Sequence, residues 1–250
     1  MHNQDSDRCE IAACGCHEDE HASLALSRRR LLGATVAGAA VALVAGAGTE
    51  LARPSAARAQ TTMTPDEALK TLMDGNQRFV DGKMTSFEHD LRLLQQHTAE
   101  KQEPFAAVLA CADSRVPVEL IFDQTIGHVF VNRVAGNIAT TEIIASLEYG
   151  AAVLGTKTIM VLGHGSCGAV AAAIASKPVP GQISSLYRAL RPAVNEGGGQ
   201  LDQCIADNAK IQAQLLRESS TVLAEMVGKG SLSVVAAVYD IATGKVTLLS

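Results

Sequence analysis

Two groups of residues with metal-binding or ionisable side chains directly follow apolar runs in this chain. The first group is Cys111, Asp113 and Arg115, and the second is His164 and Cys167. Apolar runs of five or six residues are typical of buried parallel strands. In open α/β sheets, ligands bind just beyond the carboxyl ends of such strands. We therefore expect the two groups to meet at one edge of a sheet.

Cys111, His164 and Cys167 together make a zinc ligand set. Two thiolates and one imidazole leave the fourth position of a tetrahedral zinc ion open, which is typical of catalytic rather than structural zinc. A structural site needs a fourth strong ligand, and among nearby residues only Asp113 could supply it. The sequence thus predicts Zn²⁺ as the cofactor. The alternatives are a zinc site closed by Asp113 and thiols that hold no metal.

Asp113 and Arg115 are the candidate catalytic residues. Asp113 stands two residues after Cys111, so in an extended segment both side chains point the same way. Its carboxylate could accept a hydrogen bond from zinc-bound water or hydroxide, or could bind zinc itself. Arg115, two residues further on, can hold the carboxylate through two N–H groups and keep it off the metal. A surface ion pair without a role is the alternative.

These motifs resemble those of the β-class carbonic anhydrases, which carry Cys-x-Asp-x-Arg and His-x-x-Cys. The likeness runs from about residue 64 to the C-terminus and includes the segments 117–124, 131–137 and 237–246. The resemblance implies the β-carbonic anhydrase fold and reversible hydration of CO₂ to bicarbonate and a proton through a zinc-bound hydroxide. It also implies a homodimer or homotetramer, N-terminal helices that reach the partner subunit, and an Asp113–Arg115 pair that opens and closes the zinc site.

Two other functions stay open beside this one. A related zinc hydrolase of CS₂ or COS could use the same ligands, because its linear substrates resemble CO₂. A non-catalytic member of the family could bind zinc or bicarbonate as a sensor, although it would not need the Asp113–Arg115 pair. The chain has no Trp, which departs from the subgroup in which a Trp helps to form a second, non-catalytic bicarbonate site.

His128 also has two interpretations. A histidine near the metal could carry protons to solvent. It could equally be an exposed loop residue, which we favour because nothing in the sequence fixes its distance from the metal.

The alternation of strands and helices predicts an α/β domain over residues 60–250, with a mainly parallel sheet flanked by helices. We expect about four parallel strands and one edge strand. Three residues mark the start of the first helix: Thr64 is a good N-cap, Pro65 fits the first helical position, and Glu67 completes a capping box with Thr64. The expected strands are 106–110, 129–131, 158–163 and 234–238, with the edge strand at 246–249. The other expected helices are 87–100, 117–122, 140–154, 168–175 and a helical region 182–226 that breaks near 195–199.

The composition fits such a domain and excludes some partners. Hydrophobic residues make up 47% of the chain but aromatic residues only 3%, so the core must consist of Ala, Val, Leu and Ile. A net charge of −5 offers no electrostatic footprint for nucleic acid. Three of the six cysteines, Cys111, Cys167 and Cys204, lie in the domain, which is a poor count for a disulfide framework. We interpret Cys204 as a small buried apolar residue.

Residues 1–59 have the layout of a cleaved export signal. Arg28 and Arg29 stand just before the mildly apolar run 31–47, and Ala57-Arg58-Ala59 offers a small-x-small cleavage site. Paired arginines favour a twin-arginine (Tat) signal, which predicts export to the periplasm without stable membrane insertion of the mature chain. An uncleaved membrane anchor is the alternative, since the apolar run is just under spanning length.

Overall fold

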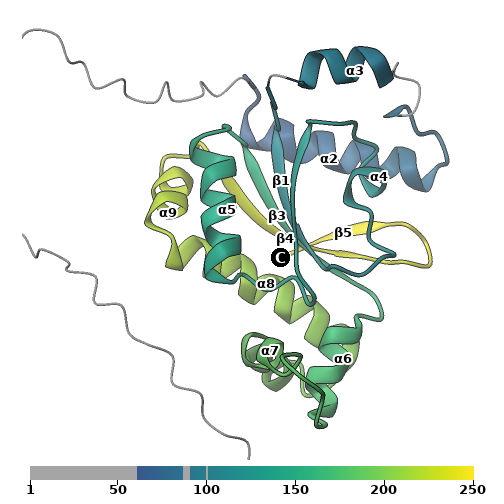
Figure 1. Cartoon of the computed structure of the whole chain (residues 1–250), viewed down its shortest axis with the longest axis vertical. Coiled ribbons are helices and arrows are strands. Elements are labelled where there is room, and N and C mark those ends of the chain that lie inside the picture. Colours follow the sequence, from purple (N-terminus) through teal and green to yellow (C-terminus); the bar gives the residue numbers. More distant parts are fainter. Residues whose placement is uncertain (1–60, 87–90, 100) are drawn as a thin grey trace, which may run out of the picture. The chain divides into compact units, whose positions relative to one another are not determined.

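A five-stranded sheet forms the centre of the structure (Figure 1), a computed structural model that describes residues 61–86, 91–99 and 101–250. The strand order is β2-β1-β3-β4-β5. The first four strands run parallel to one another, and β5 pairs with β4 in the antiparallel sense. This arrangement confirms the predicted fold class. The strands are β1 (Ala106–Ala110), β2 (Val129–Arg133), β3 (Thr158–His164), β4 (Ser233–Tyr239) and β5 (Val246–Leu249).

The helices follow the predicted order along the described residues. The predicted capping box is present: the Glu67 amide donates to Thr64 Oγ1 at 3.2 Å, and the Thr64 amide donates to Glu67 Oε2 at 2.8 Å. None of these helices is both long enough and apolar enough to pass through a membrane. They are α2 (Pro65–Val80), α3 (Leu91–Thr98), α4 (Val118–Ile121), α5 (Thr141–Ala152), α6 (Gly168–Ala175), α7 (Ser185–Glu196), α8 (Leu201–Ser219) and α9 (Thr221–Gly228).

Two of the differences from the predicted elements concern the metal ligands and the helix layer. Strand β3 extends through His164, so this residue ends the strand and does not follow it. The helical region at 182–226 breaks at Ser220 as well as at the predicted glycines. The Ser220 hydroxyl accepts a hydrogen bond from the Leu223 amide and donates one to Glu148 Oε1 at 2.6 Å, so one buried serine ends α8 and caps α9.

Alternate residues of the strands pack against different helix layers. Val108 and Met160 pack on one face with residues of α2 and α4. Leu109 and Val161 pack on the other face with residues of α5, α8 and α9. In Figure 1, α5 and α9 lie to the left of the strands and α8 lies below them, whereas α2 and α4 lie at the upper right. Each fully buried Leu or Val contributes roughly 1.5–3 kcal/mol, so this three-layer packing fixes where the carboxyl ends of the strands lie.

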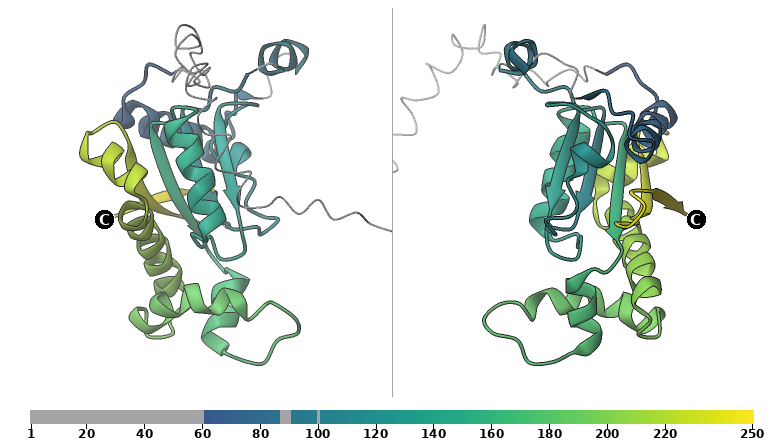
Figure 2. Two further views of the ribbon diagram at one scale, coloured as in Figure 1. Left: turned by 60° about the vertical axis from the view of Figure 1, so that its left-hand side comes forward. Right: turned by 90° about the vertical axis from the view of Figure 1, so that its right-hand side faces the viewer.

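A third cluster gathers beyond those carboxyl ends. Figure 2 shows α6 and α7 at this end of the sheet, with α8 running from them along the sheet. Gly163 lets α8 approach β3, because a Cβ there would lie 3.2 Å from Ile205 Cγ2 and 3.3 Å from the Ile205 carbonyl oxygen. The cluster consists of Cys111, Ile138, Cys167, Val170, Ala173, Leu190, Cys204 and Ile205.

Candidate metal centre

The three predicted metal ligands meet at the carboxyl edge of the sheet. Cys111 directly follows β1, His164 ends β3, and Cys167 is the N-cap of α6. All three side chains are buried, and their ligand atoms lie within 4.8 Å of one another. The cluster could therefore hold a metal ion, as the spacing of the two motifs predicts.

The orientation of the His164 ring leaves one nitrogen free for a metal. Its Nδ1 lies 2.9 Å from the Gly165 carbonyl oxygen, which can only accept, so Nδ1 carries the proton. Its Nε2 is buried and has no hydrogen-bond partner. A buried nitrogen without a partner costs free energy, and a cation within the cluster would satisfy it. A hydrogen bond from the second ring nitrogen to a carbonyl is the usual way in which a ligating histidine is oriented.

The two thiols interact with each other and with the surrounding backbone. A hydrogen bond from Cys167 lowers the pKa of Cys111 well below the usual thiol range although burial opposes it, and His164 and the Gly136 amide act in the same direction. The contact with Cys111 and burial raise the pKa of Cys167. The two thiols therefore move each other's pKa in opposite directions, and binding of a cation to both sulfurs would release any thiol proton that remains.

Asp113 and Arg115 form the predicted pair beside the cluster. Arg115 Nε donates to Asp113 Oδ1 at 2.9 Å, and Arg115 Nη2 donates to Asp113 Oδ2 at 2.7 Å. This pairing with Arg115 holds the pKa of Asp113 far below its usual value. Asp113 Oδ2 lies 3.9 Å from His164 Nε2. The carboxylate is therefore ionised and lies beside the His164 nitrogen that faces the cluster.

Arg133 is a residue near the site to which the sequence analysis gave no role. It ends β2 opposite Ala110 of β1. Its Nε donates to the Cys111 carbonyl oxygen at 2.9 Å, and its Nη2 donates to the Asp113 carbonyl oxygen at 2.5 Å. One guanidinium thus holds the backbone on both sides of Ala112. A charged residue at the carboxyl end of a strand, next to the strand of a ligand, is the signal that could have identified it.

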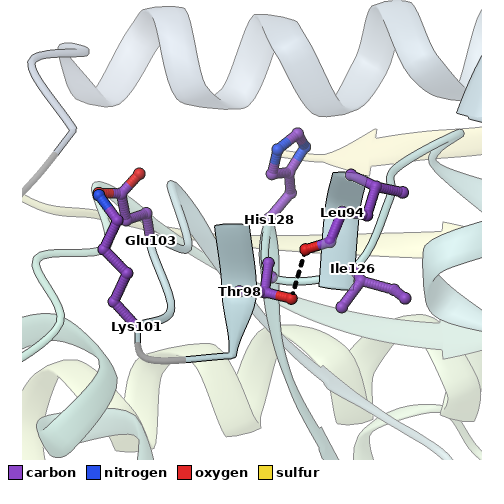
Figure 3. Close-up of a pocket in the computed structure, with 7 residues that line it drawn as sticks. Leu94, Thr98, Lys101, Glu103, Ile126 and His128 are labelled. Atoms are coloured by element: carbon purple, nitrogen blue, oxygen red, sulfur yellow. Dashed lines mark hydrogen bonds and ion pairs between the residues drawn. The ribbon is translucent and has the colours of Figure 1, made fainter. Parts of the chain in front are cut away.

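His128 lies at the other end of the strands from the metal ligands. It precedes β2 in an exposed loop, and its ring meets that of Phe105 edge-on, with centroids 6.4 Å apart. It lines a pocket of about 270 Å³, shown in Figure 3, at the amino ends of β1 and β2. The interpretation of His128 as an exposed loop residue is confirmed. The other residues lining this pocket are Leu94, Thr98, Lys101, Glu103, Ile126 and Gly127.

The comparisons with known proteins agree with this geometry. A model of the carbonic anhydrase family matches residues 106–246, which is more than half of the chain. Carbonic anhydrase 2 of Mycobacterium tuberculosis is 35% identical over 196 residues, and the match covers 74% of this chain and 92% of that protein.

Solved β-carbonic anhydrases share the fold. One of two tetrameric enzymes from Sordaria macrospora has a TM-score of 0.61 at 22% identity, covering 74% of this chain and 98% of that chain. The Coccomyxa enzyme, solved in complex with acetazolamide, has a TM-score of 0.59 at 26% identity, covering 72% and 86%. By its sequence and its fold, the chain described here belongs to the β-class carbonic anhydrase family.

Proposed function

We propose that this chain catalyses the reversible hydration of CO₂ to bicarbonate and a proton, with zinc held by Cys111, His164 and Cys167. The observation that carries this proposal is the buried Cys-His-Cys cluster with an ionised Asp113 beside it. A purely structural metal site would not need a carboxylate that is held next to the open position by its own arginine.

The donor set of the cluster fits zinc. Thiolate and imidazole ligands suit this ion, with bonds of about 2.0–2.3 Å in a tetrahedral arrangement. The chemistry that zinc supplies at such a site is to acidify water, so that a hydroxide nucleophile is available near neutral pH. Two thiolates balance the charge of the ion, so we expect activity to rise toward alkaline pH.

Asp113 orients the attacking oxygen in this proposal. An ionised carboxylate only accepts hydrogen bonds, so Asp113 would accept one from the O–H group of a water or hydroxide held at the metal and would orient that oxygen for reaction with CO₂. Arg115 occupies both carboxylate oxygens and keeps Asp113 from becoming the fourth ligand. The Arg115 Nη2 group also lies 3.3 Å from the Ser166 carbonyl oxygen, which connects the pair to the loop between His164 and Cys167. The proton released by the reaction passes to buffer.

The test is stopped-flow CO₂ hydration by the zinc-loaded protein at mildly alkaline pH. A Cys167→Ser variant should lose zinc and hydration together. Cys204→Ala is the matched control, since Cys204 is equally buried but lies outside the ligand set, and it should keep both. If the wild-type protein holds one zinc ion per chain and does not hydrate CO₂, the proposal is wrong. Hydrolysis of CS₂ or COS by the same preparation would then identify the related hydrolase.

We further propose that the chain works as a homodimer or homotetramer. The related enzymes from Sordaria macrospora are tetrameric, and two large apolar side chains near the edge strand β2, Leu91 and Ile126, are 55% and 49% exposed. Light scattering on the purified protein should give a dimer or tetramer, and Ile126→Glu should shift it toward the monomer. A monomeric wild-type protein would contradict the proposal.

Export to the periplasm is a separate proposal. It is supported by the paired Arg28 and Arg29 before an apolar run and by Ala57-Arg58-Ala59. These residues lie outside those that the structure describes. We expect the protein in the periplasmic fraction, with a mature N-terminus near Gln60 by mass spectrometry. An intact Met1 or a cytoplasmic location would overturn this proposal.

A further inference from the structure

Helix α8 carries two buried amide side chains that the reaction described above does not use. Asn208 and Gln212 stand one helical turn apart and are 0% and 1% exposed. Burial of a side-chain amide is costly unless its polar atoms find partners. The partners of these two residues therefore indicate why a mostly apolar interface contains them.

Their hydrogen bonds are directed at the segment that follows β2. Asn208 Nδ2 donates to the Gly136 carbonyl oxygen at 2.9 Å, and the Ala139 amide donates to Gln212 Oε1 at 2.9 Å. Gln212 Nε2 in turn lies 3.2 Å from Asn208 Oδ1 and 3.3 Å from the Ala189 carbonyl oxygen. The two amides thus form a connected pair that holds the backbone at 136 and 139.

This segment contains a tight turn, residues 134–137, that contacts the candidate metal ligand Cys111. The Asn137 amide donates to the Val134 carbonyl oxygen at 2.9 Å, and Gly136, the third residue of the turn, has a φ of +79° that favours glycine. In this conformation the Gly136 amide donates to Cys111 Sγ, with N and Sγ 3.3 Å apart. A Cβ at Gly136 would lie 3.2 Å from Leu190 Cδ1, so the turn has little room to move.

A hydrogen bond to a ligand sulfur changes what that sulfur gives to a metal. The N–H group attracts electron density from the thiolate, so the thiolate donates less and the metal keeps more of its positive charge. Two thiolates would otherwise neutralise a divalent ion. The Gly136 amide therefore acts in the direction that a site for acidifying water requires.

We propose that Asn208 and Gln212 are positioning residues of the metal centre, which hold the Gly136 amide on Cys111 Sγ and so limit the electron donation of this thiolate. The proposal rests on the proposed function, because it needs a metal on Cys111. It gives α8 a role in setting how much electron density Cys111 donates to the metal, although this helix lies far along the chain from both ligand motifs.

The first test observes the hydrogen bond directly. The protein is labelled with the NMR-active isotopes of nitrogen and cadmium, with cadmium bound in place of zinc. A scalar coupling between the Gly136 amide proton and cadmium is expected, because the coupling passes through the N–H···S contact. Bound cadmium without this coupling would overturn the proposal. A protein that binds no cadmium would overturn the proposed function itself, and this proposal with it.

The second test asks whether α8 controls that contact. In Asn208→Leu, and to a smaller extent in Gln212→Met, the coupling should weaken or vanish. Zinc affinity should fall roughly 10-fold, as for other residues that support a ligand. With Co(II) bound, the sulfur-to-cobalt charge-transfer band should move to lower energy, and the pH profile of kcat should move to higher pH.

Leu216→Ala is the matched control. Leu216 is fully buried on the same helix, but it packs with Leu109 and Val161 and not in the cluster that contains Cys111. It should lower stability without moving the coupling, the cobalt band or the pH profile. The proposal is overturned if both amide variants leave these three readouts at their wild-type values, or if Leu216→Ala moves them as far. If Asn208→Leu does not fold, Gln212→Met decides by the same readouts.

Discussion

Arg115 donates hydrogen bonds to both carboxylate oxygens of Asp113, at 2.9 Å to Oδ1 and 2.7 Å to Oδ2, while Oδ2 stands 3.9 Å from the ring nitrogen of His164 that faces the cluster. Under the proposed function, this pair of side chains would decide whether Asp113 binds the metal or leaves the fourth position open.

Replacement of Arg115 by lysine should weaken that restraint. An ammonium group cannot contact both oxygens in one plane, so Asp113 becomes free to turn toward the metal. We expect kcat/KM for CO₂ hydration to fall by about 10- to 100-fold while zinc content is unchanged. Cobalt spectra should report a shift toward four protein ligands. Wild-type activity in Arg115→Lys would contradict the assigned role.

Arg133 should matter for metal retention more than for the chemical step. It holds the carbonyl groups of Cys111 and Asp113, and a lysine can hold only one of them. Competition with a zinc chelator should show an affinity about tenfold lower in Arg133→Lys. Arg188→Lys on α7, an exposed arginine, is the control and should behave as wild type. Equal zinc affinities in the two variants would count against this role of Arg133.

Asp123 should make stability depend on acidity. Burial alone would raise its pKa, but hydrogen bonds from the Ser86 amide, Arg78 and the Thr85 amide outweigh burial and hold the pKa far below its usual value. Its carboxylate accepts from Arg78 Nε at 2.6 Å and from the Ser86 amide at 2.8 Å. Asp123→Asn should therefore lower the free energy of unfolding by roughly 2–3 kcal/mol at neutral pH.

The difference in free energy of unfolding between the wild type and Asp123→Asn should have its full value above the unfolded carboxyl pKa of about 3.9. It should shrink as the pH falls below that value toward the lower folded pKa, because the unfolded chain then takes up a proton while the folded protein keeps the carboxylate ionised. Urea unfolding of both proteins at neutral pH and at several pH values below 4 checks this expectation. A difference that stays constant with pH would show that Asp123 stabilises the fold without its charge.

Gly163→Ala should separate α8 from the sheet. The added Cβ would lie 3.2 Å from Ile205 Cγ2 and 3.3 Å from the Ile205 carbonyl oxygen, so helix or strand must shift, at a cost of about 1–3 kcal/mol. Gly228→Ala in α9 is the control, since a Cβ there meets no atom within 4 Å. It should be neutral or stabilising by up to about 1 kcal/mol. Unfolding curves that rank the two variants in the opposite order would contradict this packing.

The sequence predicted those parts of the structure that local patterns determine. The buried strands before Cys111 and His164 read as apolar runs, and the first helix carries its start signal in Thr64, Pro65 and Glu67. Because carboxyl ends of parallel strands share one edge of a sheet, the meeting of the two motifs followed from the strand pattern alone. The pairing of Asp113 with Arg115 needed only their spacing.

Long-range contacts were beyond these patterns. Asn208 lies on a helix whose apolar periodicity says nothing of its partner at Gly136, 72 residues away in the sequence. Ser220 ends α8, caps α9 and bonds to Glu148, and a single serine is no reliable signal for the end of a helix.

Helix α8 contacts both β3, which carries His164, and the turn behind Cys111. Both ligand motifs precede α8 in the chain, so during synthesis they leave the ribosome before this helix does. We therefore expect metal capture to be a late event in the biogenesis of the protein. The ligands come early in the chain, whereas the helix that holds the turn against Cys111 comes after both ligand motifs.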